Sequence, residues 1–104
     1  MFIDPDNPLA AEILQEAGQA YFAACKKMVK SLEALRAFDS AVGSAAHDDK
    51  QLTRRSQLLD DAAERVHCVL IQRDAMQLSG SDRFLDDYGV PAEVLARLGK
   101  HHRK

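Results

Sequence analysis

The chain has 104 residues, of which 46% are hydrophobic and 29% charged, with five glycines, three prolines and no tryptophan. These values are those of one soluble globular domain with a modest core. The formal net charge of −2 excludes a general electrostatic attraction to nucleic acid or to anionic membranes.

We expect neither secretion nor membrane insertion. The N-terminal residues Met1 to Asp6 lack the basic region and apolar core of a signal peptide. The longest apolar run of the second half, Cys68 to Ile71, is far too short to span a bilayer. The two cysteines form no CxxC pair and no disulfide framework, which favours reduced thiols and a cytoplasmic location.

The sequence predicts one long helix over residues 8–42, after a leader of residues 1–7. Asn7 is a suitable N-cap, and Pro8 suits the first turn because a missing N–H costs nothing there. Gly43 then ends the helix. One apolar stripe contains Leu14, Tyr21, Cys25, Met28, Leu32, Leu35 and Val42. At 1.5 Å per residue this helix is about 50 Å long, so it needs a long partner helix.

A second long helix is predicted over residues 49–78, after a connection at residues 43–47. Asp48 is followed three residues later by Gln51, as in a capping box. The apolar stripe of this helix contains Leu52, Leu59, Ala62, Ala63, Val66, Val69, Leu70 and Met76. The connection is short and the two helices are similar in length, so we expect an antiparallel hairpin.

Two short helices are predicted at residues 81–88 and 91–98, separated by a turn at Gly89. Their apolar residues give this part of the chain a face of its own, so we expect it to fold back across the hairpin. Residues 100–104 form a basic tail without regular structure.

Several residues of this C-terminal part are expected to end or cap its helices and to form polar contacts. Gly80 ends the second long helix, and Ser81 caps the third helix. Arg73 anchors the short helices through polar contacts, and Arg97 pairs with Asp86 or Asp87.

The predicted fold class is therefore all-α: a long antiparallel helical hairpin plus two short C-terminal helices in a single domain. A two-helix hairpin buries one face of each helix and leaves apolar flanks bare, so we expect two chains to dimerise into a four-helix bundle. The predicted function is a non-enzymatic, homodimeric interaction or structural module that binds an unidentified protein partner and needs no cofactor.

A metal-binding function is the first alternative. Glu64 and His67 share one helix face at a spacing of three residues and can bind one metal ion; a dimer would supply this pair twice, together with Glu33 of the first helix. In these residues the chain resembles the encapsulated ferritins, whose half-length chains build a di-iron site across a dimer interface. The resemblance implies iron at Glu33, Glu64 and His67 and a ferroxidase-like activity. Arg65 departs from the pattern, because those proteins carry extra acidic residues near the site. The simpler interpretation is a surface glutamate and a half-buried histidine.

A DNA-binding accessory role is a further alternative. Residues 84–98 are similar to a helix-turn-helix, with Gly89 in the turn. However, Arg97 is the only residue of the second helix suited to base contact, and Glu93 would repel phosphates. The simpler interpretation is two short helices that pack on a hairpin.

The two cysteines allow two interpretations. Cys25 and Cys68 are expected at similar heights on antiparallel helices, where they could form a redox pair or a thiolate metal site. The simpler interpretation is that both are buried and act as small apolar residues.

The C-terminal segment Tyr-Gly-Val-Pro-x-Glu-Val-Leu-x-Arg, residues 88–97, is the most specific part of a further similarity, which covers residues 58–99. In these residues the chain resembles a family of small uncharacterised proteobacterial proteins. The resemblance implies a stand-alone, helical, cytoplasmic protein without an assigned activity, and it transfers no catalytic residue.

Overall fold

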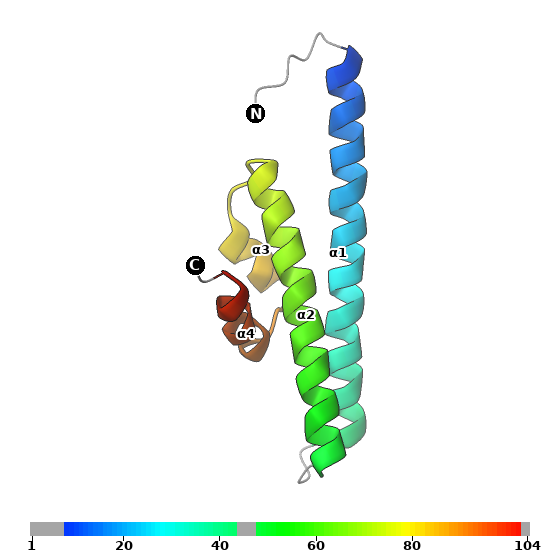
Figure 1. Ribbon diagram of the computed structural model, residues 1–104, viewed down its shortest axis with the longest axis vertical. Coiled ribbons are helices and arrows are strands. Elements are labelled where there is room, and N and C mark those ends of the chain that lie inside the picture. The colour runs from blue at the N-terminus through cyan, green and yellow to red at the C-terminus, as the bar shows by residue number, and fades with distance from the viewer. Residues whose placement is uncertain (1–7, 44–47, 103–104) are drawn as a thin grey trace.

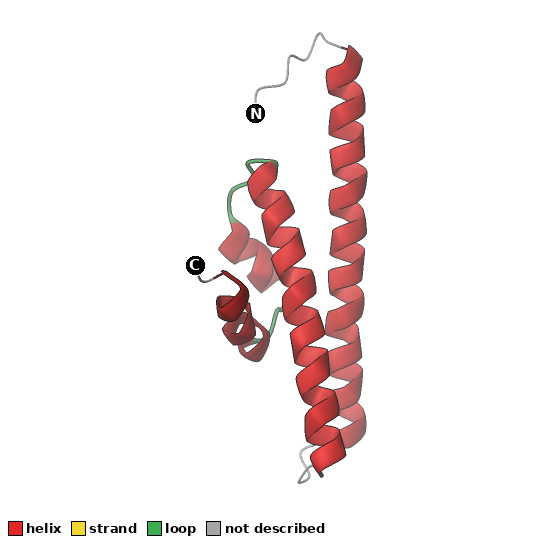
Figure 2. Ribbon diagram, in the orientation of Figure 1, coloured by secondary structure: helices red, strands yellow, loops and turns green. Residues whose placement is uncertain are grey.

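The computed structural model describes residues 8–43 and 48–102, and over these residues it contains helices, turns and short loops but no strand (Figures 1 and 2). The helices are α1 Pro8–Val42, α2 Asp49–Ala75, α3 Ser81–Asp87 and α4 Ala92–His102. The all-α class is therefore confirmed for the described residues. The predicted leader, residues 44–47 of the connection and residues 103–104 of the tail lie outside them.

The two long helices form an antiparallel hairpin (Figure 1). The end of α1 and the start of α2 carry the caps expected from the sequence. Gly43 adopts a positive φ of 71°, and its N–H bonds the Asp39 carbonyl at 2.8 Å. At the start of α2, the Gln51 N–H donates to Asp48 Oδ1 at 2.8 Å, and the Asp48 N–H donates to Gln51 Oε1 at 3.0 Å. The capping box predicted from the sequence is confirmed. It satisfies two N–H groups that a helix start would otherwise leave without partners.

The core lies along the middle of the hairpin and is closed by α4. α1 contributes three almost fully buried side chains, α2 contributes small and branched residues, and α4 adds two more apolar side chains. The buried hydrophobic residues are Met28, Leu32, Leu35, Leu58, Leu59, Ala62, Ala63, Val66, Val69, Val94 and Leu98. The alanines and valines of α2 let the helices approach closely, so the core is narrow and long.

α2 ends earlier than predicted. The helix stops at Ala75, three residues before the expected end, because Gln77 takes the left-handed φ of 58° that a helix terminator requires. The Leu78 N–H bonds the Arg73 carbonyl at 2.9 Å, and the Gln77 N–H bonds the Asp74 carbonyl at 3.0 Å. This pair of bonds is a Schellman motif. Glycine is the usual residue at that position, so the prediction placed the end too late.

Three details of the short helices also differ from prediction. Ser81 does not cap α3: the N-cap is Gly80, which makes no side-chain cap bond, and Ser81 is the first helical residue. α3 ends at Asp87, and α4 does not stop before Gly99 but continues to His102. A glycine lowers helix stability by only about 1 kcal/mol relative to alanine and ends a helix only where it adopts a left-handed conformation.

The described chain is elongated, because α1 is much longer than the part of it that α2 covers. The radius of gyration is 16.8 Å, against about 13 Å for a compact chain of this length. The N-terminal third of α1 extends past the end of α2, and no other helix of the described residues lies beside it (Figure 1). None of the described helices combines the length and the apolar character that a membrane span needs.

Candidate functional site

The three residues of the metal hypothesis do not meet within one chain. Glu33 of α1 and Glu64 of α2 are both exposed, whereas His67 is half-buried. Glu64 follows the buried Ala63 and lies on the outer side of α2, so it faces away from the hairpin core. Over residues 8–43 and 48–102, no three His, Cys, Asp or Glu side chains are grouped closely enough to hold a metal ion.

The cysteines are free, and they differ in environment. Cys25 is half-buried beside the core, whereas Cys68 is exposed. The interpretation of both as buried apolar residues is therefore wrong for Cys68. Val66 and Val69, on either side of it in the sequence, face the core, and the helical period turns Cys68 outward.

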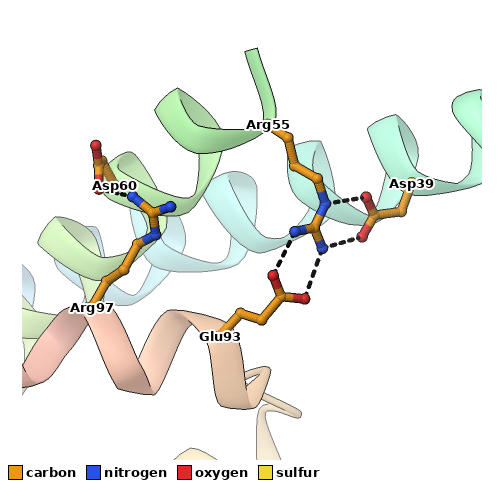
Figure 3. A network of polar contacts seen from close by, with 5 residues as sticks. All are labelled: Asp39, Arg55, Asp60, Glu93 and Arg97. Atoms are coloured by element: carbon orange, nitrogen blue, oxygen red, sulfur yellow. Dashed lines mark hydrogen bonds and ion pairs between the residues drawn. The ribbon is translucent and has the colours of Figure 1, made fainter. Parts of the chain in front are cut away.

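The helix proposed for DNA recognition turns its charged side chains toward the hairpin (Figure 3). Arg97 Nη1 donates to Asp60 Oδ1 of α2 at 2.6 Å, and Glu93 accepts hydrogen bonds from Arg55. The predicted partner of Arg97, Asp86 or Asp87, is therefore wrong. α4 lies along α2, so a carboxylate of α2 is closer than those of α3.

Arg55 joins three helices in a single network (Figure 3). Its Nε and Nη2 donate to the two oxygens of Asp39 on α1, at 2.9 and 3.2 Å. Its Nη1 and Nη2 donate to the two oxygens of Glu93 on α4, at 2.5 and 2.9 Å. Both pairs are bidentate, the strongest geometry for an arginine and a carboxylate. The hydrogen bonds from Arg55 lower the pKa of Glu93 below its usual range.

The Arg55 network predicts that α4 docking weakens in acid. Because the folded-state pKa of Glu93 lies below the unfolded value, its contribution is present above the unfolded pKa and is lost as the pH falls through the folded one. We expect Glu93→Gln to lower the melting temperature at about pH 7 and the difference from wild type to shrink toward about pH 2. In an Arg55→Ala background the same change should have little effect. A difference that stays constant with pH would contradict this assignment.

A second arginine ties the C-terminal part to the far end of the hairpin. Arg73 is only 8% exposed, and its guanidinium lies 4.3 Å from the centre of the Phe84 ring. It donates to the Tyr21 hydroxyl at 2.8 Å, the Ser79 carbonyl at 2.7 Å and Ser81 Oγ at 3.3 Å. The polar contacts predicted for Arg73 are therefore present. Burial is the main cause that raises the pKa of Tyr21.

Beside α1 lies an open groove with a volume of about 750 Å³. Its walls are apolar side chains of α1 together with Tyr88, and its rim carries three lysines. The lining residues are Tyr21, Phe22, Ala23, Cys25, Lys26, Lys27, Val29, Lys30 and Tyr88. Phe22 is 64% exposed, and Lys26 Nζ lies 5.3 Å from the centre of its ring.

This groove is the candidate interaction surface. Exposed apolar residues elsewhere on the described chain, such as Leu52 and Ile71, do not line it. An apolar groove with a charged rim indicates a binding surface for an amphipathic partner. Sequence reasoning missed it, because the apolar stripe predicted for the first helix does not include Phe22, and Tyr88 comes from a segment more than 60 residues away. The available signal was the cluster of three lysines beside Phe22.

Comparison of the chain with protein-family models, with curated proteins and with solved structures found no match. Both family resemblances therefore stay predictions, and we infer the function from the surface residues of the chain.

Proposed function

We propose that this chain is a non-enzymatic interaction module that acts as a homodimer, with α1 in the dimer interface. The observation that supports the proposal most strongly is that much of the surface of α1 is not packed against another helix of the described chain. Among residues 8–43 and 48–102, no helix lies beside its N-terminal third (Figure 1), and its middle lines an apolar groove that includes the highly exposed Phe22. Burial of apolar surface is the main driving force of protein association, so a helix left bare in this way favours a partner.

The size of the exposed helix fits such an interface. α1 has 35 residues and is therefore about 52 Å long. A stable interface buries about 800 Å² on each partner, and two helices that pack along much of this length supply an area of that order. Packing of a second hairpin against the first brings the two long helices of each chain into one assembly, the four-helix arrangement expected from the sequence, and gives α1 a neighbour on its uncovered side.

The test is the mass of the untagged protein in solution, measured by native mass spectrometry on material purified with iron present. The chain has a mass of 11.5 kDa, and we expect a species of twice this mass without bound metal. A monomer at all concentrations up to about 100 μM would overturn the proposal, because its affinity would then be weaker than that of a stable dimer. A dimer that retains iron would contradict the absence of a cofactor and support the alternative at Glu33, Glu64 and His67.

A pair of matched variants tests whether the groove is in the interface. Phe22→Asp places a charge on the exposed surface of α1, and we expect it to weaken the dimer at least about tenfold. Leu52→Asp makes the same kind of change at a residue of α2 that is 53% exposed and outside the groove. It should leave the dimer intact. Equal effects of the two substitutions would show that α1 is not the dimer interface.

A further inference from the structure

Four charges near the middle line of the outer face of α1 form two groups, and two further exposed charges, Lys27 and Glu33, lie at the edges of this face. Glu12 and Glu16 lie in the first half of the helix, and Lys26 and Lys30 lie in the middle; all four are exposed. The helical period places them on one side, opposite the buried Met28. Within the described residues of one chain, none of the four forms an ion pair.

Each group is also unfavourable by itself. The two glutamates are four residues apart, and so are the two lysines, so like charges meet one turn apart on the same helix face. Such pairs destabilise a helix. A partner that brings opposite charges to both groups removes this repulsion.

We propose that the partner is a second copy of this chain, with its α1 packed antiparallel to the first about a twofold axis level with Tyr21. In this register Glu12 faces Lys30 of the partner subunit, and Glu16 faces Lys26 of the partner subunit. The twofold axis repeats both contacts, which gives four ion pairs. This inference rests on the proposed homodimer and specifies its geometry.

The centre of this arrangement contains Gln19 and Ala23, which lie between the two charge groups on the same helix face, with Phe22 at its edge. Near the axis, the two Phe22 rings are offset by about 3 Å along the helices, since each lies one residue from the level of Tyr21. Ala23 lies beside them and is small enough for the helices to approach closely. Phe22, which is 64% exposed in one chain, loses part of this exposure when the two helices pack together. Charged residues around a packed centre are the usual anatomy of an interface.

The charge pattern selects this partner over others. In a parallel dimer each residue of α1 would face the same residue of the partner subunit. Glutamate would then face glutamate and lysine would face lysine, so all these contacts would be repulsive. An unrelated acidic helix would satisfy the lysines and leave Glu12 and Glu16 without partners. A second copy in the antiparallel direction supplies both signs at matching distances, because both groups lie symmetrically about the level of Tyr21.

Charge reversal tests the register. One variant is Glu12→Lys with Glu16→Lys, and the other is Lys26→Glu with Lys30→Glu. In the antiparallel register each variant alone turns all four ion pairs into repulsive contacts, so we expect its dimer dissociation constant to rise at least about tenfold in low salt. An equimolar mixture of the two variants restores all four pairs, and we expect a heterodimer about as stable as the wild-type dimer.

A matched control corrects for net charge. Lys50→Glu with Arg54→Glu makes the same change in charge as the double lysine variant of α1, at the same spacing, on exposed residues of α2, and it equals the double glutamate variant in the size of the change but not in its sign. It should leave the dimer unchanged, and circular dichroism should show that every variant keeps its helices. If the variants on α1 dimerise like this control, the register is wrong and the homodimer itself still stands. If the wild-type protein is a monomer, the proposed function fails.

Discussion

Replacing Leu32 by alanine should lower the free energy of unfolding by about 2–5 kcal/mol, the range observed when a buried leucine is truncated in a well-packed core. Leu32 is 1% exposed and lies in the middle of the hairpin core, in the part that α1 contributes to it. The lost methyl groups remove apolar contacts and leave a cavity. The narrow, regular packing of helices on either side can collapse only partly into it.

The measurement is denaturant unfolding at one fixed protein concentration, because dimerisation makes apparent stability depend on concentration. Leu52→Ala is the matched control: the same substitution on α2, at a side chain that is 53% exposed. It should change the free energy of unfolding by no more than about 0.5 kcal/mol. A Leu32→Ala cost below about 1 kcal/mol would mean that the core described here is not the stable core in solution.

The second large effect is expected at Arg73. Arg73→Ala removes three hydrogen bonds and the contact with the Phe84 ring, and it leaves the Tyr21 hydroxyl without this partner. Hydrogen bonds of charged groups and cation–π contacts each contribute on the order of 1 kcal/mol or more, while burial of a cation without a carboxylate offsets part of this gain. We therefore expect a net loss of about 2–3 kcal/mol.

Two comparisons make the Arg73 prediction specific. Arg83→Ala, at an exposed arginine of α3, should have an effect below about 0.5 kcal/mol. Arg73→Lys keeps the charge but cannot reach three partners from one planar group, so it should recover less than half of the loss. Hydrogen exchange should show α3 amides opening faster in Arg73→Ala than core amides of α1. Uniform acceleration across all helices would show that Arg73 does not hold α3 specifically.

Local rules were sufficient where a structural feature depends on residues close in sequence. The bounds of α1 follow from Pro8 at its start and Gly43 past its end, and the cap of α2 follows from Asp48 and Gln51. These features involve N–H and carbonyl groups within one helical turn. The same rules failed at Gln77 and Gly99. Gln77 adopts a left-handed conformation that residues other than glycine rarely take. Gly99 stays inside α4, although a glycine often ends a helix.

The candidate site could be predicted only in part. The sequence shows which residues are charged or apolar. It does not show which of them lie next to one another in the folded chain. Glu33, Glu64 and His67 share suitable chemistry and are not grouped in one chain, whereas Phe22 and Tyr88 line a common groove. A spacing in sequence defines the face of one helix and says nothing about which face of another helix lies opposite.

The sequence by itself determined that the described chain is helical, where its long helices begin, and that Met28, Leu32 and Leu35 of α1 are buried, because these features depend on the helical period and on capping groups close by. Only the tertiary structure decided that Arg55 joins Asp39 to Glu93, that Arg97 pairs with Asp60, and that Cys68 is exposed. These contacts join residues 16 to 38 positions apart or depend on the rotation of one helix against another. These contacts depend on the register and the angle at which the helices pack, and the packing of the whole core determines that register and that angle.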